Sequence, residues 1–198
     1  MSEPVNLGIL GSGRGSNFVA IADAIASGKL TARINLVASD LSSALILEEA
    51  RKRSLPVYQC PASAFKTRLE PGIETQLSEA LKKAGVDWVV LAGYMRVVKQ
   101  PLLQAFKGRI INIHPSLLPA FPGLHAWEQA LKAGVRETGC TVHWVDETVD
   151  GGAIIDQARV PVLPGHTAET LHQRIQVAEH ALLPSVLQRI AQGIIPSP

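Results

Sequence analysis

The sequence predicts an α/β fold: a Rossmann-like mixed sheet, mostly parallel and flanked by helices, with an antiparallel strand pair near the C-terminus. Apolar runs alternate with helical patterns over residues 5–113, which is typical of right-handed β–α–β crossovers and a parallel sheet. Two later strand patterns, at 140–145 and 153–162, are joined without a helix, so they are expected to pair antiparallel. A glycine-rich turn follows the first strand and leads into a helical pattern.

The first half of the chain begins with an apolar strand pattern at residues 5–10, followed by a helical pattern that stops at Gly28. Residues 87–92 predict a strand that is buried on both faces, as in a parallel sheet. Pro71 and Gly72 are expected to delay the helix in which they lie. The remaining elements of this half are strands at 34–38 and 57–60 and helices at 44–53, 69–84 and 102–106.

The second half starts with another buried strand at 110–113 and a helix at 127–133. The antiparallel pair follows, with a loop at 146–152 between its strands. Thr167 is a predicted N-cap, with Thr170 in the first turn, of a closing helix from residue 168 to about residue 191. Because no repeat or linker interrupts the pattern, residues 1–198 are expected to form a single domain.

Composition favours a compact cytoplasmic protein that acts on small molecules. Hydrophobic residues make up 46% of the 198 positions and charged residues 18%, which excludes a disordered chain. The net charge of +2 does not indicate a nucleic-acid or membrane partner, and no leader or membrane-spanning run is apparent. Cys60 and Cys140 lack metal-ligand spacing and are expected to be reduced. Composition does not distinguish a monomer from a homodimer.

The glycine turn is a candidate anion site. Gly13 and Gly15 permit tight or left-handed backbone, and Ser16 or Asn17 could cap the following helix. The N–H groups at a helix start bind phosphate, and this turn suits a phosphomonoester better than a pyrophosphate. Its spacing is not that of a dinucleotide site, although Asp40 lies where a ribose-binding acid would be. A Rossmann cofactor site and a purely connecting turn therefore remain alternatives.

Asn112, His114 and Asp150 form the candidate catalytic group. Asn112 and His114 stand two residues apart at the end of a buried strand, where open α/β sheets place their ligands. Asp150 offers a carboxylate on a glycine-flanked loop, although an ordinary turn is the simpler interpretation of that segment alone. The sequence has no nucleophile elbow and no metal-ligand cluster, so acyl transfer to the substrate's own nucleophile fits the set. His143 could face either the core or the site; the other four histidines are interpreted as surface or core residues.

These motifs resemble those of the phosphoribosylglycinamide formyltransferases (glycinamide ribonucleotide transformylases), folate-dependent enzymes of purine biosynthesis, and the resemblance covers nearly the whole chain. It implies a single formyltransferase domain that uses 10-formyltetrahydrofolate as co-substrate and no metal. The motifs that carry it are Gly13-Arg14-Gly15-Ser16-Asn17, Leu91-Ala92-Gly93-Tyr94-Met95-Arg96, Asn112-Ile113-His114-Pro115-Ser116-Leu117-Leu118-Pro119 and Val149-Asp150-Gly151-Gly152.

Carried over position by position, the resemblance assigns three groups of residues. Catalysis would fall to Asn112, His114 and Asp150. Phosphoribosylglycinamide would be bound by Gly15, Ser16, Asn17, Gln176 and Glu179. Folate would be bound by Arg68, Met95, Arg96, Val97, Val98 and Asn112, with the backbone of residues 147–152 around the pterin.

The resemblance also implies a cis bond between Leu118 and Pro119. The sequence departs from other members at Ala120, where some carry a basic residue, and at Arg14, where others have a smaller polar one. Arg14 could contact phosphate or simply face solvent.

The implied reaction moves the formyl group of 10-formyltetrahydrofolate to the amine of 5'-phosphoribosylglycinamide by direct attack of that amine. Asn112 and a protonated His114 would stabilise the oxyanion, while Asp150 would keep His114 cationic and assist proton transfer. Three alternatives stay open at this stage: a formyltetrahydrofolate hydrolase-like enzyme, a nucleotide-binding Rossmann module that does no chemistry, and a dehydrogenase.

Overall fold

The computed structural model describes residues 3–196, which contain a seven-stranded sheet in the order β3-β2-β1-β4-β5-β6-β7. Strands β1 to β5 run parallel, whereas β5–β6 and β6–β7 pair antiparallel, as the sequence predicts. The strands are β1 Val5–Leu10, β2 Ala32–Ser39, β3 Val57–Gln59, β4 Trp88–Leu91, β5 Ile110–His114, β6 Glu137–Trp144 and β7 Ile154–Pro161.

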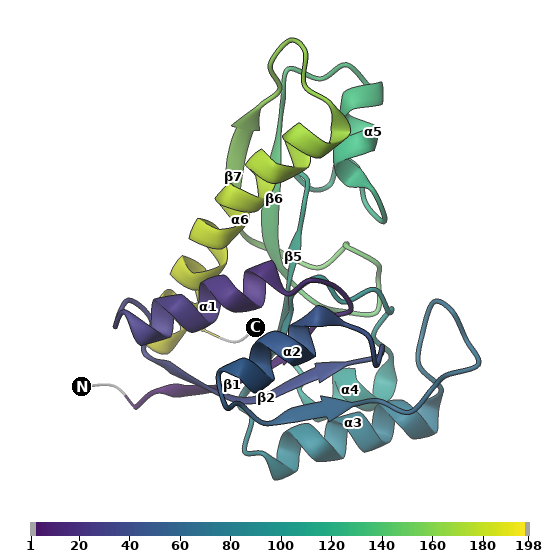
Figure 1. Cartoon of the computed structure of the whole chain (residues 1–198), viewed down its shortest axis with the longest axis vertical. Coiled ribbons are helices and arrows are strands. Elements are labelled where there is room, and N and C mark those ends of the chain that lie inside the picture. Colours follow the sequence, from purple (N-terminus) through teal and green to yellow (C-terminus); the bar gives the residue numbers. More distant parts are fainter. Residues whose placement is uncertain (1–2, 197–198) are drawn as a thin grey trace.

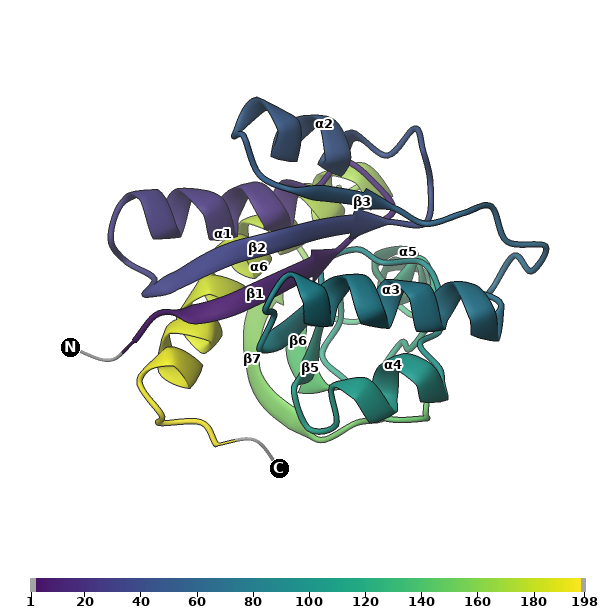
Figure 2. The same cartoon turned by 90° about the horizontal axis from the view of Figure 1, so that it is seen from below.

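Helices cover both faces of the sheet. Helices α1 and α2 lie on one side of β1 and β2, and α3 and α4 lie on the other (Figure 2). The long α6 packs on the face of α1, and α5 lies beside the N-terminal half of α6, where β6 and β7 extend away from the other strands (Figure 1). The helices are α1 Ser16–Ala26, α2 Leu45–Lys52, α3 Pro71–Lys83, α4 Gln100–Ala105, α5 Ala126–Lys132 and α6 Ala168–Ala191.

Two apolar clusters, one on each face, hold these layers together. The cluster beneath α1, α2 and α6 contains Phe18 and Ile21, both fully buried. The cluster beneath α3 and α4 contains Leu77 and Phe106, which are equally inaccessible. Burial of a large apolar side chain contributes about 1.5–3 kcal/mol, so these layers fix the sheet to which the polar groups described below are attached.

Most predicted boundaries agree with the structure, and two local predictions fail. Thr167 and Thr170 form the capping box that opens α6. In contrast, neither Ser16 nor Asn17 caps α1, because left-handed Gly15 (φ 79°) occupies the N-cap. Strand β6 begins at Glu137, three residues before the predicted start, because its polar first residues do not show an apolar alternation. No helix among residues 3–196 is both long and apolar enough to cross a membrane.

The strand order also identifies the edge at which a ligand is expected. Strand β1 is followed by β2 on one side and by β4 on the other, so the chain reverses its direction of winding between them. Open α/β sheets bind ligands outside the carboxyl ends of the strands at such a point. The turn after β1, the segment after β4 and the end of β5 all lie on this edge.

Candidate active site

Strand β5 places Asn112 and His114 on one face of the sheet, because side chains two apart on a strand point the same way. Ile111 and Ile113 alternate with them and join the cluster beneath α1 and α6. The antiparallel register sets His143 of β6 directly opposite Asn112, so both side chains share a face. The end of β5 therefore carries one amide and two imidazoles on the same side.

The loop between β6 and β7 brings the Asp150 carboxylate to this group. Asp150 Oδ2 lies 3.3 Å from His114 Nδ1 and accepts a 2.8 Å hydrogen bond from the Gly123 N–H. Asp150 Oδ1 lies 3.4 Å from Asn112 Nδ2 and 3.7 Å from His143 Nε2. Three side chains predicted from the sequence are thus brought together, although Asp150 is 36 or more positions away from the other two.

His143 is the member of the group whose orientation the sequence left open. Its Nδ1 lies 2.7 Å from the Trp144 carbonyl oxygen, to which Nδ1–H donates. In the neutral ring, Nε2 then accepts from the Asn112 side-chain amide, 3.0 Å away. His143 therefore orients the amide of Asn112, and one Asn112 N–H is left with only the long contact to Asp150. The strand register that reveals this role is not visible in the sequence.

Burial and charge act on the group in opposite directions. Burial lowers the pKa of His114 below its usual range, and the neighbouring Asp150 carboxylate opposes this effect without overcoming it. This shift favours the neutral ring, and its Nε2–H donates to the Phe121 carbonyl oxygen, 2.9 Å away. Burial by itself would raise the pKa of Asp150, but its polar neighbours, among them the Gly123 N–H that donates to Oδ2, lower that pKa, so Asp150 is ionised.

The glycine turn lies against α6. The Asn17 side-chain amide donates to Glu179 Oε2 over 2.9 Å, which ties the start of α1 to a residue 162 positions away. Burial raises the pKa of Glu179 to about 7. Gly15 has no room for a side chain, since a Cβ would lie 2.8 Å from the Cβ of Ile46. A β-branched residue at Gly15 would therefore disturb the packing as well as the anion site.

A buried network on the other side of the turn involves Asp40. Asp40 Oδ1 accepts from the Ser12 hydroxyl at 2.5 Å, and Oδ2 accepts from Arg96 Nε at 2.6 Å. Ser12 Oγ in turn accepts from the Met95 N–H at 2.9 Å, and Arg96 also donates to the Phe65 carbonyl. Both carboxylate oxygens of Asp40 are occupied, so it is not available to bind a ribose as in a dinucleotide site.

Comparison with known proteins identifies the family. A model described as formyl transferase matches residues 5–187. The chain belongs to the formyl transferase family. It is 40% identical over 189 residues to the phosphoribosylglycinamide formyltransferase of Escherichia coli strain K12, covering 96% of this chain and 88% of that protein. It is also 47% identical over 198 residues to the trifunctional purine biosynthetic protein adenosine-3 of Drosophila pseudoobscura pseudoobscura, of which it spans 14%.

Solved structures agree with this membership. Glycinamide ribonucleotide transformylase 1 from Symbiobacterium toebii superposes with a TM-score of 0.91 at 46% identity, covering 96% of this chain and 89% of that one. The phosphoribosylglycinamide formyltransferase of Bacillus halodurans gives a TM-score of 0.87 at 41% identity, with coverages of 96% and 97%. The chain therefore shares its fold with these formyl transferases over nearly its full length.

The residues assigned to folate occupy different environments in this formyl transferase. Met95 is 55% exposed, whereas Val98 is 4% exposed and packs in the cluster beneath α3 and α4. Arg68 forms an isolated parallel β-bridge with Val97, which places it beside this segment. The Arg96 side chain is held by Asp40, so it orders the segment from within. Sequence alone cannot separate these roles, because the motif is the same whichever side chains point inward.

Two further expectations can be compared with the structure. The Leu118–Pro119 bond is cis, as the resemblance to the formyltransferases implies. Among residues 3–196, no three His, Cys, Asp or Glu side chains are grouped so that they could hold a metal ion. Cys60 and Cys140 are free and buried, and burial raises the pKa of each thiol to about 12. Such thiols stay protonated and are poor nucleophiles.

Gly152 is needed to seat the Asp150 loop. A Cβ at Gly152 would lie 1.8 Å from the Trp144 carbonyl oxygen, so Gly152→Ala must displace the loop. Because a misplacement of about 1 Å can cost about 10² in rate, kcat for formyl transfer is expected to fall by about that factor. Steady-state kinetics measure it, with Gly72→Ala as the control, since nothing lies within 4 Å of a Cβ there. Equal activity of both variants would contradict a requirement for this loop position.

Asp40→Asn should weaken folate binding more than it slows the reaction. The substitution keeps the shape of Asp40 but leaves the Arg96 guanidinium, whose side chain is 12% exposed, without its carboxylate. Loss of such a charged hydrogen bond costs about 1.5–3 kcal/mol, so KM for the folate is expected to rise at least about tenfold. Kinetics and urea denaturation measure the two effects, with Asp23→Asn as the exposed control. An unchanged folate KM would show that Asp40 does not order the Met95–Arg96 segment.

Proposed function

We propose that this formyl transferase is a phosphoribosylglycinamide formyltransferase, a single domain that moves the formyl group of 10-formyltetrahydrofolate to the amine of 5'-phosphoribosylglycinamide. The observation that carries the proposal is the closed group of Asn112, His114 and Asp150 at the end of β5. Close relatives bear that enzyme's name. Two buried, free thiols suit a reducing compartment such as the cytoplasm.

The proposed chemistry starts when the neutral substrate amine attacks the formyl carbon. A C–N bond forms, the formyl oxygen becomes an oxyanion and the amine acquires a positive charge. Asp150 Oδ1 is free to take the amine proton, since its contacts to Asn112 and His143 are long. Neutral His114 can share that proton, because its Nδ1 lies 3.3 Å from Asp150 Oδ2.

Sharing the proton makes His114 an imidazolium beside the developing oxyanion. The imidazolium and the loosely engaged Asn112 N–H then stabilise the negative charge, in a site where water is largely excluded. As the bond from the formyl carbon to N10 breaks, the same pair returns the proton to N10. In this mechanism the His114 cation forms during the reaction and is not present before it.

The remaining contacts are proposed to position the two substrates. The backbone N–H groups of Gly15, Ser16 and Asn17 would receive the phosphate at the start of α1, and Gln176 and Glu179 of α6 would contact the ribosyl group. Arg68 and the segment 95–98 would hold the folate, and the backbone of the Asp150 loop would contact its pterin. This arrangement would bring the amine and the formyl group together at the end of β5.

The test is an assay with 10-formyltetrahydrofolate in the presence and absence of phosphoribosylglycinamide. We expect consumption of the formyl folate only when the amine is present, with formylated amine formed in equal amount. Consumption without the amine would identify a hydrolase. Binding of the nucleotide without consumption under either condition would favour a module that does no chemistry.

A further inference from the structure

Three side chains lie along one side of α6: His172, Gln176 and Glu179, spaced by four and three residues. The Glu179 end of this row is tied to the start of α1 through Asn17, as described above. The His172 end stacks on Trp127 of α5, with ring centroids 3.7 Å apart and planes within 3°. The row therefore runs from the start of α1 to α5, and His172 is the member without an assigned role.

The unpaired positive charge of Arg14 lies near the His172 end of the row. Arg14 is exposed in the glycine turn and forms no ion pair with any residue in the range 3–196. Burial lowers the pKa of His172, and the nearby charges of Arg14 and His125 lower it further. His125 itself lies 3.2 Å from Glu128, whereas no carboxylate of the described chain pairs with Arg14 or His172. An anion is the ligand such an arrangement favours.

A buried acceptor without a partner marks the other end of the row. Asn17 is 7% exposed, and its Oδ1 has no hydrogen-bond partner among the described residues. A buried acceptor left unpaired costs about 1–3 kcal/mol, so a ligand that carries a donor group, such as a hydroxyl, would be favoured here. The row thus suits a ligand with an anionic end and a hydroxyl-bearing end.

We propose that Arg14 and His172 complete the phosphate site of the phosphoribosyl substrate, together with the N-terminus of α1. Arg14 pairs with the phosphate charge, while His172, held flat by Trp127, donates a ring N–H to a phosphate oxygen. This inference rests on the proposed function and extends it, because neither residue belongs to the set that the family resemblance assigns. Arg14, which departs from the family pattern, thereby acquires a role in substrate affinity.

The test measures KM and kcat for phosphoribosylglycinamide in Arg14→Ala and His172→Phe. Phenylalanine keeps the stacking on Trp127 but removes the ring N–H. Loss of one charged hydrogen bond corresponds to about a tenfold change in affinity, so KM is expected to rise about tenfold in each variant. Because neither residue touches the reacting atoms, kcat and the folate KM are expected to stay within about twofold.

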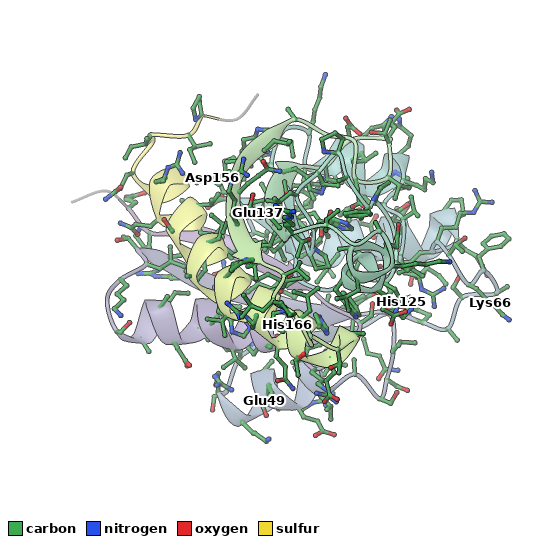
Figure 3. All side chains as sticks on the ribbon, turned by 90° about the horizontal axis from the view of Figure 1, so that it is seen from above. Glu49, Lys66, His125, Glu137, Asp156 and His166 are labelled. Atoms are coloured by element: carbon green, nitrogen blue, oxygen red, sulfur yellow. The ribbon has the colours of Figure 1, made fainter. Side chains whose placement is uncertain are left out.

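Arg174→Ala is the matched control. It removes an arginine charge from α6, the helix that carries His172, but Arg174 points toward His166, with Arg174 Nη1 3.4 Å from His166 Nε2. Figure 3 shows His166 beside the first turns of α6, with Asp156 beside the opposite end. An equal rise of KM in Arg174→Ala would show that KM responds only to the net charge of the protein. The assignment of Arg14 to the phosphate site would then be overturned. A wild-type KM in His172→Phe would leave His172 only its stacking role.

Competition of ribose 5-phosphate and of ribose with the substrate tests the phosphate site independently of the proposed formyl transfer. We expect ribose 5-phosphate to bind the wild-type enzyme more tightly than ribose, and Arg14→Ala to remove most of that difference. The Arg14 contribution should also weaken as salt is added, since exposed charges are screened. If the wild-type enzyme transfers no formyl group but keeps this preference, the proposed function fails and the phosphate site stands. An active enzyme in which Arg14→Ala keeps the full preference overturns the inference alone.

Discussion

Replacing Asp150 with asparagine is expected to lower kcat for formyl transfer by about 10²–10³, because the group that takes the amine proton is lost. The amide preserves the shape of Asp150 and can still contact the Gly123 N–H, so the loop should remain closed. The proposed phosphate site lies elsewhere, on α1 and α6, so KM for phosphoribosylglycinamide should change little. Single-turnover kinetics with saturating folate isolate this step.

Asp146→Asn serves as the control for charge in the same loop. Asp146 is exposed and accepts from the Thr148 N–H at 2.8 Å, without contact to the catalytic group. This variant is expected to keep near-normal turnover. A turnover of Asp150→Asn close to that of Asp146→Asn would contradict the proton-transfer role of Asp150.

The order and type of the elements could be predicted from the sequence because hydrophobic periodicity is a local signal. The strand at 87–92 and the helix with its Thr167–Thr170 cap were both apparent. The predicted caps of α1 failed because left-handed Gly15 occupies the N-cap, while the Asn17 side chain, already inside the helix, donates to Glu179 across the molecule. Local preference decided most of the fold, and a long-range contact holds the side chain that was expected to cap α1.

The relative positions of the candidate catalytic side chains could be predicted only for residues on the same strand. Asn112 and His114 share a face by spacing alone, whereas the position of His143 depends on the register of β5 with β6. Asp150 was a candidate as a carboxylate on a glycine-flanked loop, but its approach to His114 depends on the path of that loop around Gly152. The sequence could not show that both Asp40 oxygens are occupied, because their partners, Ser12 and Arg96, come from the turn after β1 and from the segment after β4.

The pKa of His114 could not be predicted from a sequence motif. The sequence places a carboxylate near an imidazole, which by itself raises the imidazole pKa. The fold also buries His114 to 5% exposure, and this desolvation has the opposite sign and the larger effect. The balance of the two depends on packing, so it had to be determined from the structure.

His114→Ala is expected to lower kcat by about 10²–10³, since both the shared proton and the positive charge beside the oxyanion are lost. Binding of phosphoribosylglycinamide should be retained, because His114 contacts neither α1 nor α6. Steady-state kinetics and equilibrium binding measure the two effects. A variant with nearly normal turnover would show that Asp150 and Asn112 suffice without the imidazole.

The timing of His114 protonation can be tested by following its ring proton resonances against pH. Because burial lowers the pKa of His114, its midpoint should lie below the ordinary value of 6.5 in the free enzyme. Asp150→Asn removes the carboxylate that raises this pKa, so the midpoint should move to still lower pH. In the unfolded chain the imidazole titrates at its ordinary value, so His114 stabilises the fold above about pH 6.5, and this contribution is lost as pH falls through the lower folded value. A midpoint above 6.5 in the free enzyme would contradict this timing. His114 would then carry its positive charge before the amine attacks, and the oxyanion would form beside an existing imidazolium.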